Sequence, residues 1–171
     1  MNHLTSHLQR AMVHDLSVMQ HLLTKLPESA WDYRPRENMR SVPELLHYLS
    51  YIGSSSLAVF LAGGFVPENM SIFREARERT ANLTRGDFHD AFETEKHAIT
   101  EALASVTDED LYSRPSLQAG KIEGSLLDAI LNGSVKYLAS YKMQLFLYAK
   151  ECGAEVSTPN NWRGVDPVPT A

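Results

Sequence analysis

The sequence predicts an all-α protein, a four-helix bundle with long crossover connections. Four segments repeat apolar residues at helical spacing, no segment shows a convincing strand alternation, and proline or glycine follows three of the four segments. A chain of 171 residues has room for one domain with a substantial core. We therefore expect a single bundle domain over residues 1–171, with helices of about 20–27 residues joined by unequal loops.

The first and third predicted helices each carry one apolar stripe. The first spans about residues 2–26, and Pro27 ends it. Its inward-facing residues are Leu4, Leu8, Met12, Leu16, Met19, Leu22, Leu23 and Leu26. The third spans about residues 87–106, with Asp87 as its expected N-cap. Its stripe consists of Phe88, Ala91, Phe92, Ile99, Ala102 and Leu103.

The second predicted helix, residues 41–62, has clear signals at both ends. Ser41 and Glu44 have the spacing of a capping box, in which each side chain binds the backbone N–H of the other residue. Gly63 and Gly64 follow the last apolar position and are expected to close the helix. The shared face consists of Leu45, Leu49, Ile52, Ser56 and Phe60.

The fourth predicted helix, residues 125–151, completes the bundle and ends at Gly153. The connections over residues 27–40 and 65–86 are long and polar, and the one over 107–124 is intermediate in length. Long connections of this kind are typical of bundles whose chain crosses over between non-adjacent helices.

The end of the chain, from about residue 154 to 171, is predicted to be a non-helical tail. It contains Pro159, Pro167 and Pro169, and a proline removes a backbone donor and disrupts a helix interior. We expect Trp162 to hold part of this tail against the bundle surface.

The composition excludes several classes of function. The net charge is −5 without a cluster of Lys and Arg, which argues against nucleic-acid binding. No apolar run approaches the ~18 residues of a membrane span, and the N-terminal residues lack the order of a signal peptide. Cys152 is the only cysteine, which excludes an internal disulfide and suits a reducing compartment. We expect a soluble, cytoplasmic protein that does not contact membranes.

Five polar or phenolic residues are predicted to face the bundle interior. Tyr137 and Tyr141 are four apart, so a helix presents both to one place. Tyr48 lies beside the stripe of the second helix, and Asp15 and Glu95 fall inside the stripes of the first and third. Such groups could converge where bundles build ligand and metal sites. Alternatively, the tyrosines are core residues whose hydroxyls bind Asp15, Glu95 or water.

The seven histidines do not form a recognisable metal motif. His3, His7, His14 and His21 project opposite the leucine stripe of the first helix. His47 also points away from the stripe of its helix, about 100° from the direction of Tyr48. There is no HExxH, and no histidine pair faces the interior.

Three stretches of the sequence resemble the DinB/YfiT family of four-helix-bundle proteins. Residues 26–35 resemble its LP-x-x-x-W/L-x-x-R-P pattern, and residues 40–49 resemble W-S-V-x-E-L-L-x-H-L. Residues 137–148, YLASYKMQLFLY, resemble H-x-x-H-H-R-G-Q-L-x-x-Y. The resemblance covers most of the chain and implies a bundle with a pocket between helices.

The chain departs from this family at the metal ligands. The resemblance implies zinc or nickel held by three histidines, and the matching positions here are Tyr48, Tyr137 and Tyr141. A phenol with a pKa near 10 is protonated at neutral pH and is a poor ligand for a divalent ion. We therefore expect no metal cofactor.

These observations lead to one functional hypothesis and to two alternatives. We expect a DinB-like protein without the divalent metal site, whose tyrosine-lined pocket is structural or binds a small molecule. The first alternative is a metal-free enzyme that uses Asp15 or Glu95 as a general base. The second is a metal-dependent one that recruits His47 with carboxylates. Either could be a thiol-conjugating transferase or a hydrolase-like enzyme, as the resemblance implies.

A homodimer is also expected from the apolar residues that lie off the main stripes. Val13 and Val18 lie on the polar side of the first helix, and Met143, Phe146 and Leu147 lie off the stripe of the fourth. A solvated face carries fewer apolar groups than this. We therefore expect two copies of the chain to bury part of the fourth helix.

Overall fold

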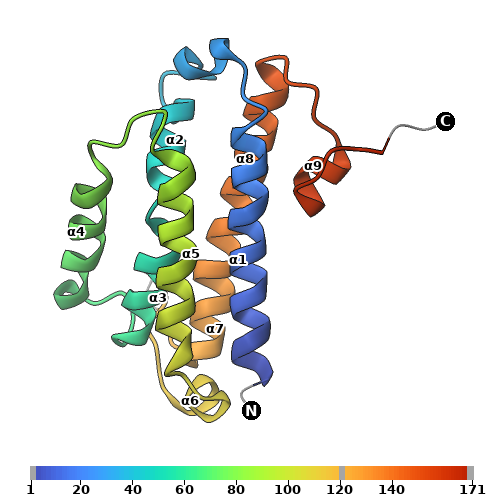
Figure 1. Cartoon of the computed structure of the whole chain (residues 1–171). Coiled ribbons are helices and arrows are strands. Elements are labelled where there is room, and N and C mark those ends of the chain that lie inside the picture. Colours follow the sequence, from blue (N-terminus) through green and yellow to red (C-terminus); the bar gives the residue numbers. More distant parts are fainter. Residues whose placement is uncertain (1–2, 120–121, 169–171) are drawn as a thin grey trace.

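The structure, a computed structural model, describes residues 3–119 and 122–168 (Figure 1). These residues form helices and loops, and the β-type pairing among them is limited to isolated bridges. The predicted all-α fold is confirmed. Four helical arms pack side by side as the bundle (Figure 1). Two arms are single helices, α1 (His3–Leu23) and α5 (Phe88–Ala104). The other two are each made of two successive helices: α2 (Val42–Leu49) with α3 (Ile52–Leu61), and α7 (Leu126–Ile130) with α8 (Lys136–Glu151).

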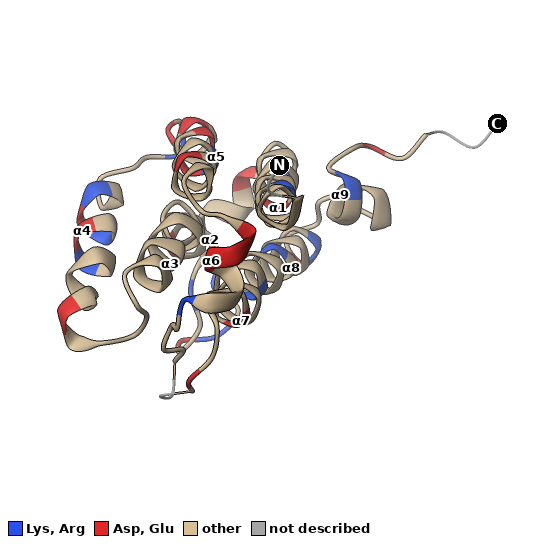
Figure 2. Cartoon of the chain, turned by 90° about the horizontal axis from the view of Figure 1, so that it is seen from below, with Lys and Arg blue, Asp and Glu red and all other residues tan. Residues whose placement is uncertain are grey.

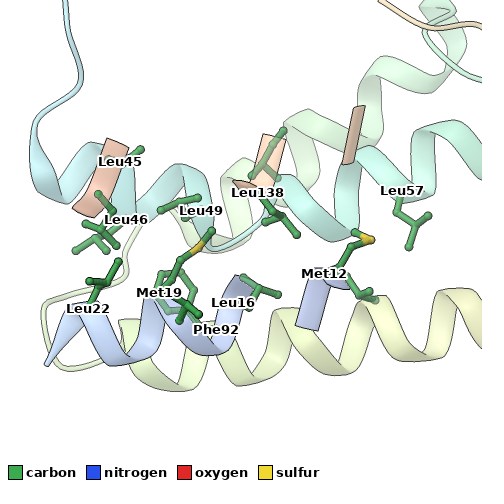
Figure 3. Close-up of a cluster of buried hydrophobic side chains, with 14 of the residues drawn as sticks. Met12, Leu16, Met19, Leu22, Leu45, Leu46, Leu49, Leu57, Phe92 and Leu138 are labelled. Carbon is green, nitrogen blue, oxygen red and sulfur yellow. The ribbon is translucent and has the colours of Figure 1, made fainter. Parts of the chain in front are cut away.

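The core lies along the axis of this bundle and contains most of the predicted stripes, together with Leu46 and Leu57, which the predicted stripes did not include. Side chains from α1 interlock with those of α2, α3, α5 and α8 (Figure 3). The fully buried members labelled there are Met12, Leu16, Met19, Leu22, Leu45, Leu46, Leu49, Leu57, Phe92 and Leu138. Burying such side chains contributes about 1.5–3 kcal/mol each, so these stripes dominate the folding free energy.

The predicted capping box begins α2. Ser41 Oγ accepts a hydrogen bond from the Glu44 N–H at 3.3 Å, and the Glu44 carboxylate accepts one from the Ser41 N–H at 2.9 Å. The same carboxylate accepts a hydrogen bond from Arg34 at 2.5 Å. This loop is therefore fixed where it enters the helix, and the residue next to it, Arg40, is fixed with it.

The second predicted helix is not continuous, which corrects the expectation for residues 41–62. It breaks at Ser50 and Tyr51, and Tyr51 has φ −144° and ψ −18°. Two serine hydroxyls at the break bind carbonyls that also accept backbone N–H groups: Ser50 donates to the Leu46 carbonyl at 2.8 Å and Ser55 to the Tyr51 carbonyl at 2.6 Å. The helix resumes as α3 and ends before Gly63 and Gly64, as predicted.

Two of the connections contain helices that the sequence pattern does not predict. The segment 65–86 folds into α4 (Met70–Thr80), which packs against α2 and α3 outside the bundle (Figure 1). The segment 107–124 contains α6 (Asp108–Ser113). Asp87 does precede α5, but its carboxylate binds Thr84, at 2.7 Å from the backbone nitrogen, instead of capping the helix.

The prediction of a wholly non-helical tail is wrong, because α9 (Thr158–Arg163) lies within it. Ser157 and Asn160 form a capping box, and Pro159 occupies the first turn, where its missing N–H has no partner to lose. The new helix packs on α1 and α8. It is held partly by His14, whose Nε2 lies 2.9 Å from the Trp162 carbonyl oxygen.

A π-helical turn, Leu131–Val135, joins α7 to α8. Gly133 faces the ring of Phe60 so closely that a Cβ there would lie 2.3 Å from ring carbons. The Ser56 hydroxyl donates to the Ser134 hydroxyl at 2.8 Å across the same interface.

None of the described helices is both long and apolar enough to cross a membrane.

Candidate functional site

Two of the three predicted site tyrosines meet. The rings of Tyr48 and Tyr141 pack edge to face, with centroids 4.8 Å apart and planes inclined at 69°. Tyr51, which the sequence analysis did not select, packs against the other side of Tyr48 at 5.5 Å. Tyr137 lies one turn before Tyr141 on α8 and is half-buried. The helical spacing of four therefore places α8 tyrosines beside α2, as expected.

Two adjoining cavities open beside these tyrosines, between α2, α3 and α4. Their volumes are about 480 and 410 Å³, and they share Tyr48, Tyr51 and Arg77. We call them together the tyrosine groove. Its first part is lined by Arg40, Glu44, His47, Tyr48, Tyr51, Arg77, Thr80 and Ala81. Its second part is lined by Tyr48, Tyr51, Ile52, Phe65, Phe73, Arg74, Arg77 and Tyr137.

The groove hydroxyls are protonated at neutral pH. Burial, and then the neighbouring Tyr141, raise the pKa of Tyr48 well above its ordinary value. Burial likewise raises the pKa of Tyr51 and of Tyr137. A protonated phenol can donate one hydrogen bond and accept others, so these side chains suit recognition of oxygen atoms on a ligand.

A guanidinium group lies over the tyrosine pair. The Arg40 Cζ is 4.1 Å from the ring centroid of Tyr48 and 5.4 Å from that of Tyr141. Both distances are within the range of cation–π attraction. Arg40 comes directly before the capping box of α2, and this fixed entry places its side chain over the rings.

His47 lines the first part of the groove but is anchored elsewhere. Its Nδ1 lies 2.8 Å from the Thr80 carbonyl oxygen, and its ring packs edge to face on Phe88 at 5.1 Å. A carbonyl oxygen only accepts, so Nδ1 carries the hydrogen and donates it. His47 thereby links α2 to the end of α4.

The two predicted carboxylates have partners other than the tyrosines. Lys142 Nζ donates to Asp15 Oδ1 at 2.6 Å, in a pair whose side chains are only 7% and 13% exposed. Glu95 accepts from the Ser54 N–H at 2.7 Å and from the Ser54 hydroxyl at 2.5 Å. In the described residues neither carboxylate binds a tyrosine hydroxyl, so the expected convergence of all these groups does not form.

Most of the groove residues, including Tyr51, Arg40 and Arg77, lay outside the sequence-based selection. Tyr51 follows Tyr48 by three positions, and this helical spacing is the signal that could have identified it. Arg40 and Arg77 had no such signal. Arg77 reaches the groove only because α4 folds against α2 and α3, a tertiary arrangement without a local sequence pattern.

The charged side chains give no obvious cation site. Within residues 3–119 and 122–168, no group of three or more His, Cys, Asp or Glu side chains is placed to hold one metal ion. The tyrosine groove contains His47 and Glu44, but Glu44 is already paired with Arg34.

The fold and the groove define a class: an α-helical bundle whose candidate site lies where α8 tyrosines meet α2. Two solved structures that are similar to this chain are DinB-like. A proposed member of the DinB family from Exiguobacterium sibiricum 255-15 matches with a TM-score of 0.70 and 18% identity, over 94% of this chain and 99% of that one. A DinB-like protein from Bacillus subtilis, YjoA, matches with a TM-score of 0.67 and 19% identity, over 88% and 94%. No protein-family model and no curated protein matches the sequence.

Proposed function

We propose that this chain is a DinB-like protein that binds a small molecule in the tyrosine groove and does not use a divalent metal there. The observation that carries the proposal is the pair of adjoining cavities, of about 480 and 410 Å³, at the tyrosines. Ligand pockets in proteins commonly have volumes of roughly 300–1,000 Å³ and combine apolar walls with a few polar groups. If the tyrosines had only a structural role, their rings would instead fill the space between the helices and leave no cavity beside them.

The donor atoms support the metal-free part of the proposal. The resemblance to the DinB/YfiT family implies that Tyr48, Tyr137 and Tyr141 correspond to its three histidines. The raised pKa values of Tyr48 and Tyr137 keep their hydroxyls protonated, and a neutral phenol competes poorly with water for zinc or nickel.

Elemental analysis tests the metal-free part directly. We expect the purified protein to carry less than about one zinc or nickel per chain. A variant with Tyr48→His, Tyr137→His and Tyr141→His should gain about one ion, because it supplies three neutral imidazoles at adjoining positions. One tightly held divalent ion per chain in the unmodified protein would contradict the proposal.

Small-molecule binding can be tested by NMR with ¹³C-labelled tyrosine rings. A mixture of small aromatic and aliphatic compounds should shift the ring signals of Tyr48, Tyr51 and Tyr137 in the same titration. Tyr137→Phe should weaken binding without unfolding the protein, because it removes a hydroxyl and keeps the ring. The matched control is Tyr112→Phe, since Tyr112 lies on α6 and is 66% exposed. Equal effects of both substitutions would count against a site at the groove.

A further inference from the structure

The tyrosine groove combines a cationic part with an apolar part. Arg40 and Arg77 line one cavity, and Arg74 joins Arg77 in the other. The apolar lining of the second cavity comes from Ile52, Phe65 and Phe73. This concentration of positive charge is local, because the whole chain has a net charge of −5. Figure 2 shows the basic residues of α4 distributed along this outlying helix.

Among the described residues, Arg40 is held in place by ring contacts and its N–H groups donate no hydrogen bond. Its guanidinium stacks over Tyr48 and Tyr141, and stacking engages the face of the group while leaving its N–H edge available. Arg34, six residues earlier, contrasts with it: its N–H groups bind the Met39 carbonyl and Glu44, at 2.5 Å each. The N–H groups of Arg40 are therefore positioned to donate hydrogen bonds to an oxygen atom of a ligand.

The cations of the groove are not neutralised by the protein. Across the described residues, no carboxylate lies within ion-pairing distance of Arg40, Arg74 or Arg77. Glu44 is the acidic residue in the groove lining, and its two oxygens are occupied by Arg34 and the Ser41 N–H. The local balance in the groove is therefore positive.

Arg40 and Arg77 line the same part of the groove and come from different elements. Both guanidinium groups act on the Tyr51 hydroxyl, where each lowers the pKa while burial raises it. Arg40 belongs to the loop before α2 and Arg77 to α4, and both line the first part of the groove together with Tyr51. A ligand atom near Tyr51 would therefore meet two cations and a hydroxyl donor.

We propose that the ligand of the tyrosine groove is an organic anion whose carboxylate or phosphate group binds Arg40 and Arg77 and whose apolar body lies against Ile52, Phe65 and Phe73. This inference rests on the proposed function, because it specifies the ligand of the same groove. Guanidinium groups match carboxylate and phosphate oxygens through two parallel N–H donors. In the apolar part of the groove, the binding free energy of a hydrophobic group becomes more favourable in proportion to the apolar area that it buries.

The test uses three probes that share a ring system and differ in charge: 2-naphthoate, 2-naphthyl phosphate and the neutral 2-naphthamide. Calorimetric titration of the full chain should give at least about tenfold tighter binding for one of the anions than for the amide. The anion that binds more tightly identifies the head group, carboxylate or phosphate. Binding of the anions should weaken as salt is added, and binding of the amide should not.

Substitutions then assign the charge recognition to particular residues. Arg40→Gln and Arg77→Gln should each weaken anion binding about tenfold or more and leave amide binding unchanged. The control is Arg85→Gln, since Arg85 stacks on Trp31 and pairs with Glu28 away from the groove. Circular dichroism and the melting temperature verify that each variant is folded.

The outcomes separate this inference from the proposed function. If all three probes shift the groove tyrosine signals with equal affinity and the arginine variants change nothing, the groove binds ligands but the anion inference is wrong. If no probe and no compound of the screening mixture shifts Tyr48, Tyr51 or Tyr137, both proposals fail. Anion binding that Arg85→Gln weakens as much as Arg40→Gln does would also overturn the inference, because it would reflect general surface charge.

Discussion

Glu95 on α5 caps the first turn of α3, binding both the backbone N–H and the hydroxyl of Ser54. The break at Tyr51 leaves the first N–H groups of α3 without partners in their own helix, and Tyr51 provides no side-chain cap. Glu95 is 3% exposed, and Gly53 has no side chain that would displace it, since a Cβ there would lie 3.1 Å from Oε1. This carboxylate therefore satisfies donors at the start of a helix that the break leaves uncapped.

Glu95 should make the protein less stable as pH rises. Burial raises the pKa of Glu95 above its usual 4.5, and this outweighs the opposing hydrogen bonds from Ser54 and Gly53. Between 4.5 and the folded-state pKa, the unfolded chain has lost a proton that the folded chain keeps. The contribution of Glu95 to the free energy of unfolding is therefore largest below pH 4.5 and falls as pH rises through this window. Glu95→Gln should flatten this part of the urea-unfolding profile from pH 4.5 to 8.

The loss of unfolding free energy in two Glu95 variants distinguishes a role of Glu95 as a helix cap from a role as a buried side chain alone. Glu95→Gln keeps the shape and an acceptor for the Ser54 N–H, so its cost at pH 5 should stay within about 1 kcal/mol. Glu95→Ala orphans that N–H and leaves a cavity, at a cost of about 2–4 kcal/mol. Parallel pH profiles for the wild type and Glu95→Gln would show that Glu95 does not hold an extra proton in the folded state.

The buried pair of Asp15 and Lys142 should show strong coupling in a double-mutant cycle. Removing one partner leaves the other charge buried, so Asp15→Leu alone should cost about 3–5 kcal/mol. Asp15→Leu with Lys142→Met removes both charges and should recover most of that loss. Urea unfolding of the four proteins measures the cycle. Additive costs would contradict the idea that the two groups depend on each other.

Gly64 is predicted to be far less replaceable than its neighbour Gly63. Both have positive φ angles, +103° and +105°, so alanine at either site should cost about 1–3 kcal/mol of backbone strain. A Cβ at Gly64 would also lie 2.1 Å from the Leu117 carbonyl oxygen, whereas one at Gly63 meets nothing within 4 Å. Gly64→Ala should therefore unfold at a clearly lower temperature than Gly63→Ala, and equal melting temperatures would refute this.

The docking of α9 should weaken in acid. Asn160 Nδ2 donates to His21 Nε2 at 3.0 Å, which requires that nitrogen to be unprotonated. Burial lowers the pKa of His21 below 6.5, more strongly than nearby Asp166 raises it. The contribution of His21 is therefore present above 6.5 and is lost as pH falls towards its lowered pKa. Amide hydrogen exchange in α9, corrected for intrinsic rates, should quicken several-fold over that window, and His21→Gln should remove the change.

The predicted homodimer can be measured by light scattering. Some of the apolar surface behind this prediction is covered within the chain, because Gly164 lies against Val18 and the Asn161 amide lies 3.9 Å from Met143 Sδ. Leu147 remains 51% exposed on α8. We expect a species of twice 19.2 kDa at micromolar concentration, and Leu147→Glu should shift it towards the monomer. A 19.2 kDa species in the unmodified protein would contradict the prediction.

The sequence predicts the long helices well because their apolar spacing is a local signal that the core then uses. It does not predict the break at Tyr51, because the group that stabilises the new helix start, Glu95, comes from another helix. Pro159 was interpreted as a helix breaker, although a proline in a first turn is compatible with a helix. The spacing of Tyr137 and Tyr141 predicts that they share one face of their helix, whereas the position of Arg77 depends on how α4 packs.

The π turn at Leu131–Val135 has a consequence for how this site could change over evolution. Such a turn takes in one residue more than an α-helix of the same path would need. Each residue rotates an α-helix by about 100°, so the turn sets the phase of α8 against that of α7. Losing one residue there would turn Tyr137 away from the groove and Tyr141 away from Tyr48, or would turn α7 away from the core. A single insertion or deletion, rather than a series of substitutions, could therefore create or abolish the site in one step.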